Sequence, residues 1–231
     1  MNRYVRLNIE RPEKAFVKEF MDYDVSTVYE AQGKIGLLNY DLRPIIEGSF
    51  ICGPAVTVTC MAGDNLMIHA AIEAVQPGDI LVVSTIGESH HGMIGELIVR
   101  ALIEKGVQGV IIDAGIRDVK QLRKLGFPVW SKAIYSQGTT KNRGGWVNAP
   151  CVCGGVQVNP GDLIMADDDG VVRIKSVNIE AVLELTKKRV EREKVVKSKI
   201  KNGELSIDFY NLRPILEKEE VVYIDSFNVN V

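Results

Sequence analysis

An adjacent arginine and aspartate follow a short apolar run in the middle of the chain. Residues 109–113, with the sequence GVIID, predict a buried strand, and Arg117 and Asp118 lie just beyond its carboxyl end. Ligands of open α/β sheets bind at that edge. Arg117 can hold a carboxylate or enolate oxygen through its planar donors, and Asp118 can hold a hard cation. A surface ion pair, with Asp118 capping the following helix, is the purely structural interpretation of the same two residues.

An acidic residue at the start of a predicted helix precedes this strand. Gly92 and Gly95 allow a tight turn, and the helix that follows has leading amide hydrogens without intrahelical partners. Such a helix start attracts a carboxylate or a phosphate, which makes Glu96 a candidate site residue. The structural interpretation is that Glu96 only favours the helix start, by about 0.3 to 1 kcal/mol.

Further polar residues each allow two interpretations. Asp64, Asn65 and His69 lie at the start of another predicted helix. They either add polar groups to a pocket or serve as a helix cap and a partly buried histidine. Residues 167–170, with the sequence DDDG, could suggest a cation site, but their place between two predicted strands favours a hairpin turn.

The elements that would position these residues alternate between strands and helices. Two Pro-Gly-Asp turns, at residues 77–79 and 160–162, stand before apolar runs, and proline followed by glycine suits a type II turn. The alternation predicts an α/β layered domain. Strands are expected at residues 54–60, 80–84, 109–113 and 128–131, and helices at residues 11–22, 64–75, 94–105 and 119–125, with another helix starting at Ser26 or Thr27.

The pattern changes after Ile174. A long charged helix is expected at residues 178–201, followed by a break at Gly203 and a short segment, residues 208–219. Its many charges leave only a narrow apolar stripe on the helix. The sequence therefore predicts that the helix packs on another subunit.

Composition and charge limit the partners and the compartment. The chain has 231 residues, 46% of them hydrophobic, and 28 Lys and Arg against 30 Asp and Glu leave a formal net charge of -2. Without a basic excess, a nucleic acid partner is not expected. Residues 1–10 lack the apolar core of a signal peptide and no segment reaches membrane-spanning length, so a soluble, cytoplasmic protein without a membrane partner is expected. The four cysteines are expected to be buried thiols rather than disulfides or a zinc site.

Long stretches of the chain resemble one enzyme family. The sequence is similar to the class II pyruvate aldolases that act on 4-hydroxy-4-methyl-2-oxoglutarate and 4-carboxy-4-hydroxy-2-oxoadipate, members of a superfamily that also contains the regulator of ribonuclease activity A. The resemblance covers nearly the whole chain, which makes it more specific than a short motif. It is carried by EAQGKIGLL at residues 30–38, GDNLMIHAAIE at 63–73, IIDAGIRD at 111–118, GFPVWSKAIYSQGT at 126–139, NPGDLIMADDDGVV and the later ELSIDFY.

The resemblance implies roles for particular residues. The family's signature is an acid, twenty intervening residues and then Arg-Asp, which Glu96, Arg117 and Asp118 fit. Asp118 would hold magnesium or another divalent cation such as manganese, and Arg117 would hold the pyruvyl oxygens. Glu96, where the family more often has aspartate, would position a proton-carrying water. The amides implied to bind the substrate carboxylate belong to Gly95, Glu96, Leu97 and Ile98.

The resemblance also implies an architecture. Residues 1–175 would form a single layered α/β domain of the swivelling β/β/α type, and residues 176–231 a C-terminal helical extension that packs on a neighbouring subunit. The protein would be a homo-oligomer, either a trimer or a hexamer made of two trimers. Glu193 of the extension would complete a neighbour's catalytic site, with Glu191 as the alternative.

The implied reaction is magnesium-dependent retro-aldol cleavage of such a small 2-oxo acid to pyruvate and a second 2-oxo acid. The substrate would chelate the cation while Arg117 stabilises the enolate. The same enolate forms when oxaloacetate loses carbon dioxide, so oxaloacetate decarboxylation is expected as a side or main activity. Schiff-base chemistry is the enzymatic competitor, and Lys132 is the lysine to check for it. A non-catalytic, protein-binding regulator of ribonuclease activity is the alternative that is not an enzyme.

Overall fold

The structure, a computed structural model, describes residues 2–224. The chain divides into two compact units, Met1–Thr186 and Lys187–Val231. All described strands and all described buried residues belong to the first unit. No helix within residues 2–224 has both the length and the apolar character needed to span a membrane.

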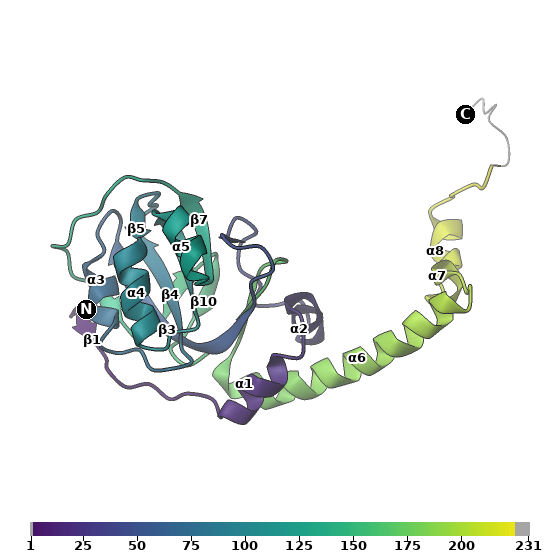
Figure 1. The fold of residues 1–231 in the computed structure, drawn as a ribbon. Coiled ribbons are helices and arrows are strands. Elements are labelled where there is room, and N and C mark those ends of the chain that lie inside the picture. The colour runs from purple at the N-terminus through teal and green to yellow at the C-terminus, as the bar shows by residue number, and fades with distance from the viewer. Residues whose placement is uncertain (1, 225–231) are drawn as a thin grey trace. The chain divides into compact units, whose positions relative to one another are not determined.

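A mixed sheet forms the centre of the first unit (Figure 1). Its strands are β1 (Tyr4–Val5), β2 (Arg43–Pro44), β3 (Ile51–Met61), β4 (Ile80–Ile86), β5 (Gly92–Ile94), β6 (Gly109–Ile116), β7 (Val129–Ile134), β8 (Trp146–Val147), β11 (Leu163–Ala166) and β12 (Val171–Ile174). The main path runs β1-β8-β3-β4-β6-β7-β2, and β9 (Cys151–Cys153) and β10 (Val156–Val158) form a separate pair. Because β3, β4, β6 and β7 are parallel neighbours, their carboxyl ends lie at one edge of the sheet.

Helices cover one face of this sheet. The first unit contains α1 (Lys14–Phe20), α2 (Val25–Ala31), α3 (Leu66–Ala71), α4 (Glu96–Glu104), α5 (Val119–Leu125), a 3-10 turn (Ser176–Asn178) and the start of α6 (Ile179–Lys201). Figure 1 shows α3, α4 and α5 together on one side of the strands. Their apolar side chains, among them Ile68, Val99 and Leu122, form one core cluster with Val83 and Ile112 of the sheet.

Strands cover the opposite face. Ile111 and Trp130, from β6 and β7, pack in a second apolar cluster with Cys153 of β9 and Ile164 of β11. A third cluster joins α1, α2 and the start of α6 to β11 and β12. Two β layers and one helical layer make the first unit a β/β/α domain, which confirms the layered α/β fold predicted from the sequence.

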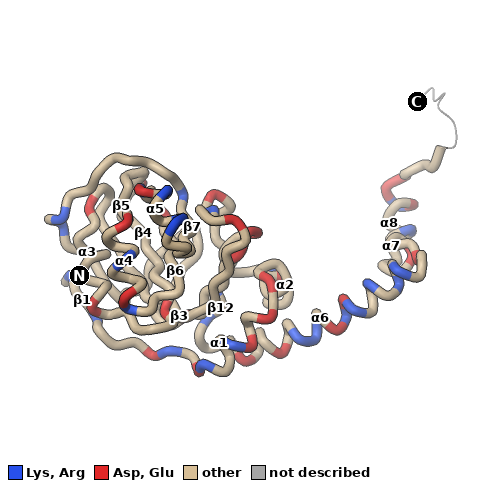
Figure 2. The backbone as a smooth tube through the Cα atoms, in the orientation of Figure 1, with Lys and Arg blue, Asp and Glu red and all other residues tan. Residues whose placement is uncertain are grey.

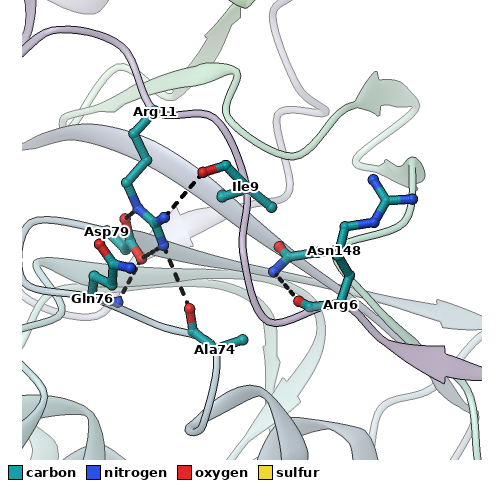
Figure 3. Close-up of polar contacts among 7 residues, drawn as sticks. All are labelled: Arg6, Ile9, Arg11, Ala74, Gln76, Asp79 and Asn148. Atoms are coloured by element: carbon teal, nitrogen blue, oxygen red, sulfur yellow. Dashed lines mark hydrogen bonds and ion pairs between the residues drawn. The ribbon is translucent and has the colours of Figure 1, made fainter.

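The first helix begins later than the sequence predicts. A helix is expected over residues 11–22, whereas α1 spans Lys14–Phe20. Arg11 is engaged elsewhere, because its Nε and Nη2 each lie 2.8 Å from a carboxylate oxygen of the fully buried Asp79 (Figure 3). Asp79 also accepts the Gln76 amide at 2.7 Å, which closes the turn before β4. Arg11 thus fastens the N-terminal segment to the sheet, and the helix starts only after it.

The second helix begins earlier than the sequence predicts, at Val25. Its N-cap is Asp24, whose Oδ1 accepts a hydrogen bond of 2.7 Å from the Thr27 amide. The prediction of a helix start at Ser26 or Thr27 is therefore wrong, because the nearby aspartate takes the cap position.

The acidic stretch at residues 167–170 is a hairpin turn, as predicted. It joins β11 and β12, which pair antiparallel. Asp167 accepts the amide of Val25 at 2.9 Å, and Asp168 accepts the amide of Gly48 at 2.9 and 3.0 Å. These carboxylates therefore hold backbone segments together.

All four cysteines are buried free thiols, as predicted. Burial raises the pKa of Cys52 and Cys60 to about 12 and the pKa of Cys151 to about 11. Burial also raises the pKa of Cys153. Thiols that resist ionisation are poor metal ligands and nucleophiles, so these residues act as core side chains.

The second unit consists of the rest of α6, then α7 (Ser206–Phe209) and α8 (Arg213–Lys218). Acidic and basic residues follow one another along α6 (Figure 2). The charged helix predicted at residues 178–201 is thus present. None of residues 187–224 is buried. The packing of this segment on another subunit stays a prediction, as does the boundary expected near residue 175.

Candidate active site

A pocket of about 170 Å³ lies where β5 leads into α4 and where β6 leads into α5. Both junctions follow the carboxyl ends of strands, the edge at which open α/β sheets bind ligands. The structure brings to this pocket every residue that the sequence predicted for the site within the first unit, namely Gly95, Glu96, Leu97, Ile98, Arg117 and Asp118.

Asp118 has a left-handed backbone, with φ 59° and ψ 27°. Such a conformation costs a non-glycine residue on the order of 1 kcal/mol, and strain of this kind gathers at functional sites. The carboxylate makes no capping bond to α5 but turns back, and its Oδ2 accepts the Glu96 amide at 3.2 Å. The capping interpretation of the side chain is therefore wrong. Oδ1 has no hydrogen-bond partner within residues 2–224.

Gly95 and Gly92 let the two junctions approach each other. A Cβ atom at Gly95 would collide with Oδ2 of Asp118, and one at Gly92 would lie 2.5 Å from the Tyr135 carbonyl oxygen and 2.8 Å from Cβ of Arg117. Gly95 has an extended backbone, with φ -141°, so no left-handed turn requires it. The glycines are needed because any side chain would displace Arg117 and Asp118, a reason that the sequence did not reveal.

Arg117 keeps most of its donors free. Its side chain is 48% exposed, and Nε lies 3.9 Å from Oδ2 of Asp118, its one ion pair within residues 2–224. The backbone N–H of Arg117 donates to the Ile94 carbonyl at 2.9 Å. The backbone is therefore anchored while the guanidinium can offer a planar pair of donors to an anionic ligand.

Glu96 has one carboxylate oxygen engaged on its own helix. Arg100, one turn later on α4, donates to Oε1 from Nε at 2.9 Å and from Nη2 at 2.8 Å. An exposed pair with this spacing contributes about 0.3 to 0.5 kcal/mol. Glu96 lies in the first turn of α4, so the helix-start interpretation stays open beside a role at the pocket, where Glu96 is a lining residue.

Three further polar residues line the pocket: Asn65, His69 and Lys141. Asn65 donates through Nδ2 to the Met93 carbonyl at 2.8 Å, and its Oδ1 is buried with no hydrogen-bond partner in the described part of the chain. Burial, and then the charge of Lys141, lower the pKa of His69, so its imidazole is neutral near pH 7. The sequence left Asn65 and His69 open between pocket and cap, and it gave no signal for Lys141, which lies in a distant loop.

The oxygen donors in the pocket fit magnesium. This cation prefers oxygen ligands, keeps several waters and binds proteins through one or two carboxylates. Asp118 offers a carboxylate that is 42% exposed, with Oδ1 free of hydrogen bonds within residues 2–224, and the Glu96 carboxylate lines the same pocket. Within residues 2–224 no group of three or more His, Cys, Asp or Glu is placed to hold a metal.

Lys132, the lysine to check for Schiff-base chemistry, does not line this pocket. Its Nζ lies 3.7 Å from Oδ1 of Asp113 and 3.5 Å from Oε1 of Glu88. Partial burial lowers the pKa of Lys132, but Asp113, Asp41 and Glu88 outweigh burial and raise the pKa above its usual value. An ammonium that keeps its proton is a poor nucleophile, so the structure does not favour the Schiff-base competitor.

Glu193 lies on α6 in the second unit. Its Oε1 is 3.0 Å from Nε of Arg189, one helical turn earlier, and Glu191 pairs with Lys194 at 2.6 Å. The expectation that one of these acids completes a neighbour's site therefore stays a prediction.

The first unit matches a known family. A family model described as RraA-like, Aldolase/RraA, matches residues 24–173, the part of the chain that contains the pocket and most of the central sheet. The chain belongs to the Aldolase/RraA family. The resemblance that the sequence carries is thereby confirmed.

Three known proteins are similar to this chain over most of their length. A protein of Halalkalibacterium halodurans, named provisionally as a 4-hydroxy-4-methyl-2-oxoglutarate aldolase, is 29% identical over 202 residues, which cover 87% of this chain and 96% of that protein. An uncharacterized protein of Methanocaldococcus jannaschii is 31% identical over 174 residues, which cover 74% of this chain and 83% of that protein. The crystal structure of Streptomyces coelicolor RraAS2, described as an unusual member of the RNase ES inhibitor RraA protein family, has a TM-score of 0.74 and 27% identity over 82% of this chain and 99% of that one. These names give different functions, so the residues of the pocket have to indicate the reaction.

Proposed function

We propose that the chain is a class II, metal-dependent pyruvate aldolase, a carbon–carbon lyase. The proposed substrates are 4-hydroxy-4-methyl-2-oxoglutarate and 4-carboxy-4-hydroxy-2-oxoadipate, cleaved to pyruvate and a second 2-oxo acid. The observation that carries the proposal is that the Asp118 carboxylate, the Arg117 guanidinium and the start of α4 meet in one pocket. Membership of the Aldolase/RraA family and the provisional name of the Halalkalibacterium halodurans relative support it.

Asp118 is the proposed holder of magnesium or manganese. A divalent cation bound there supplies a Lewis acid that draws negative charge onto the ketone oxygen of the 2-oxo acid. The substrate carboxylate lies at the start of α4. The Glu96 amide already donates to Asp118, so the amides of Gly95, Leu97 and Ile98 are the proposed donors for that carboxylate.

Lys141 and His69 are the proposed partners of the second carboxylate of the substrate. Both line the pocket, and the Lys141 ammonium makes no ion pair within residues 2–224. Neutral His69 can donate one hydrogen bond without adding charge. A dicarboxylic 2-oxo acid therefore suits the pocket better than pyruvate alone.

The chain's own residues handle charge and protons during cleavage. When the C3–C4 bond breaks, its electron pair moves into the enolate, and Arg117 stabilises the charge that develops on the pyruvyl oxygen. Glu96 positions a water that takes the proton from the 4-hydroxyl group and returns a proton to C3. Glu193 of a neighbouring subunit is proposed to complete the site.

Oxaloacetate decarboxylation is proposed as a second reaction of the same site. Loss of carbon dioxide from oxaloacetate leaves the same enolate of pyruvate, so Arg117 acts on it in the same way. Both reactions therefore depend on one set of residues.

A protein-binding regulator of ribonuclease activity is the second candidate. It is favoured by the TM-score of 0.74 to RraAS2, a member of an RNase inhibitor family. Such a role would require neither a cation nor the approach of Arg117 to Asp118.

Release of pyruvate from the purified full chain separates the two candidates. We expect pyruvate from 4-hydroxy-4-methyl-2-oxoglutarate and from oxaloacetate, lost in excess chelator and restored by magnesium or manganese. If neither 2-oxo acid releases pyruvate faster than in the same magnesium or manganese solution without protein, the aldolase proposal is refuted and the regulator is favoured.

A further inference from the structure

We infer that Asp64 is a positioning residue, which fixes the loop at residues 140–143 so that Lys141 faces the pocket. Asp64 itself does not line the pocket. The inference rests on the proposed function only for what Lys141 binds there, the second carboxylate of a dicarboxylic 2-oxo acid.

One carboxylate oxygen of Asp64 gathers the loop. Its Oδ2 accepts the Thr140 hydroxyl at 2.6 Å, the Asn142 amide at 2.8 Å and the Arg143 amide at 3.2 Å. Lys141 lies between two residues that this oxygen holds. The backbone on both sides of Lys141 is therefore fixed relative to Asp64.

The backbone around Asp64 holds the same loop. The Thr140 amide donates to the Gly63 carbonyl at 2.9 Å, and the Thr140 carbonyl accepts the Asn65 amide at 3.0 Å, which makes a parallel bridge at Asp64. The other carboxylate oxygen, Oδ1, accepts the Leu66 amide at 3.0 Å and ties the side chain to the start of α3. The segment that brings Asn65 to the pocket therefore also holds the loop at residues 140–143 in place.

Asp64 is 1% exposed and forms no ion pair within residues 2–224. Burial raises its pKa, but hydrogen bonds from Thr140, Asn142, Leu66 and Arg143 outweigh burial and leave the pKa below its usual value. The carboxylate is therefore ionised at neutral pH, and neutral donors alone stabilise its charge. Because a buried charge is costly without its donors, the loop that supplies most of them is held firmly.

Asp162 provides a matched control. It is also 1% exposed, and it accepts the amides of Asn159 and Ser176 at 2.9 Å each. Its backbone carbonyl accepts the Ala55 amide near the amino end of β3, at the edge of the sheet opposite the pocket. Replacing Asp162, whose Oδ2 also lies 3.9 Å from Nε of Arg173, removes a carboxylate that is buried to the same extent without touching the loop of Lys141.

Trypsin tests whether Asp64 holds the loop at residues 140–143, without any assumption about enzymatic activity. The enzyme cleaves after Lys141 and Arg143, and a hydrogen-bonded loop must open before it can be cut. Asp64→Asn removes the charge and puts an NH2 group in place of one carboxylate oxygen, so this group faces a backbone amide either of the loop or of the start of α3. Cleavage at these two bonds should therefore become about tenfold faster in the folded protein. Asp162→Asn should leave the cleavage rate at both bonds unchanged, as measured by mass spectrometry of the fragments.

A second variant keeps the test decisive if Asp64→Asn does not fold. Thr140→Val removes one donor to Asp64 and preserves the shape of the side chain, so the same two bonds should be cut faster than in the unaltered chain. Unchanged cleavage after Lys141 and Arg143 in the folded variants would overturn the inference.

A double-mutant cycle tests whether Asp64 acts through Lys141. Asp64→Asn should raise KM for 4-hydroxy-4-methyl-2-oxoglutarate about tenfold with a smaller change in kcat, and should add no further loss to Lys141→Met. Independent, multiplying effects would overturn the positioning role. If the unaltered chain releases no pyruvate, the proposed function fails, and the trypsin result alone decides whether Asp64 holds the loop.

Discussion

At the scale of single residues, the site depends on the conformation that brings the adjacent Arg117 and Asp118 to one pocket. Neighbouring residues of an extended strand point to opposite faces of a sheet. The left-handed backbone of Asp118 interrupts that alternation, so both side chains line the pocket. The missing Cβ of Gly95 leaves the space that the Asp118 carboxylate occupies. Backbone strain and an absent side chain thus produce a geometry that residue types alone do not specify.

Asp118→Asn should abolish pyruvate release while the fold persists. A hard cation loses the carboxylate that is proposed to hold it, so the Kd for manganese should rise by a factor of about ten or more. Paramagnetic resonance with manganese measures that Kd, and a thermal melt close to that of the unaltered chain is the control for folding. Full activity in this variant would rule out the proposed cation site.

Arg117→Lys should lower kcat about a hundredfold, because a lysine keeps the charge but loses the planar pair of donors that the enolate oxygen needs. KM should change less, since the carboxylate still binds at the start of α4. Steady-state kinetics on 4-hydroxy-4-methyl-2-oxoglutarate and on oxaloacetate should show the same loss. A loss in only one of the two reactions would mean that they do not share the enolate site.

At the scale of elements, strands and helices were predicted correctly where the apolar pattern and the flanking turn residues indicate the same element. The helix expected at residues 119–125 is α5 with the same bounds, and the buried run GVIID lies within β6. The start of α1 could not be predicted, because Arg11 binds a carboxylate far along the chain, at Asp79. The elements therefore follow from local sequence, whereas the start of α1 depends on a contact with a residue far along the chain.

The residues of the candidate site were also predictable where local sequence marks them, but not where a distant contact places them. Glu96, Arg117 and Asp118 stand at junctions that the sequence marks with glycines and a buried strand, and the structure brings all three to one pocket. Lys141 lies in a loop without periodicity, and its place is set by hydrogen bonds to Asp64, more than seventy residues away. No local pattern records such a contact.

Arg11→Met should destabilise the first unit by about 3 to 5 kcal/mol, because it leaves the fully buried carboxylate of Asp79 without its cationic partner. Urea unfolding measures the change in the free energy of unfolding. Arg100→Met is the control, since it removes an exposed partner and should cost less than about 1 kcal/mol. Equal effects of the two substitutions would show that Asp79 does not need Arg11.

The stability that Asp64 contributes should depend on pH. Its pKa is lower in the folded chain than in the unfolded one, so the contribution is complete above the unfolded pKa of about 3.9 and is lost as pH falls through the folded pKa. The difference in the free energy of unfolding between the unaltered chain and Asp64→Asn should therefore be larger at pH 7 than at pH 3. A difference that does not change with pH would contradict the assigned shift.

At the scale of the whole molecule, the two units differ in what they bury. The buried apolar side chains among residues 2–224 lie between Phe20 and Leu183, all in the first unit. In the second unit, Ile200, Leu205 and Ile215 are 57%, 59% and 54% exposed. Helices gain most of their stability from packing an apolar face, so we expect these side chains to contact another subunit of a trimer or hexamer.

A site shared between subunits makes a quantitative prediction. If Glu193 of one subunit completes the site around Asp118 of another, Glu193→Gln and Asp118→Asn should each be inactive, yet coexpression of the two variants should restore activity. In a closed ring with random assembly, each site draws its two residues from two chains, and about one quarter of the sites receive both intact residues. Pyruvate release from purified mixed oligomers, compared with the unaltered protein, measures this fraction. A parallel mixture with Glu191→Gln identifies which acid is used, because the acid that is not used gives an active variant on its own. If Glu193→Gln is inactive alone and mixing restores no activity, both residues act within one chain, and the shared site is ruled out.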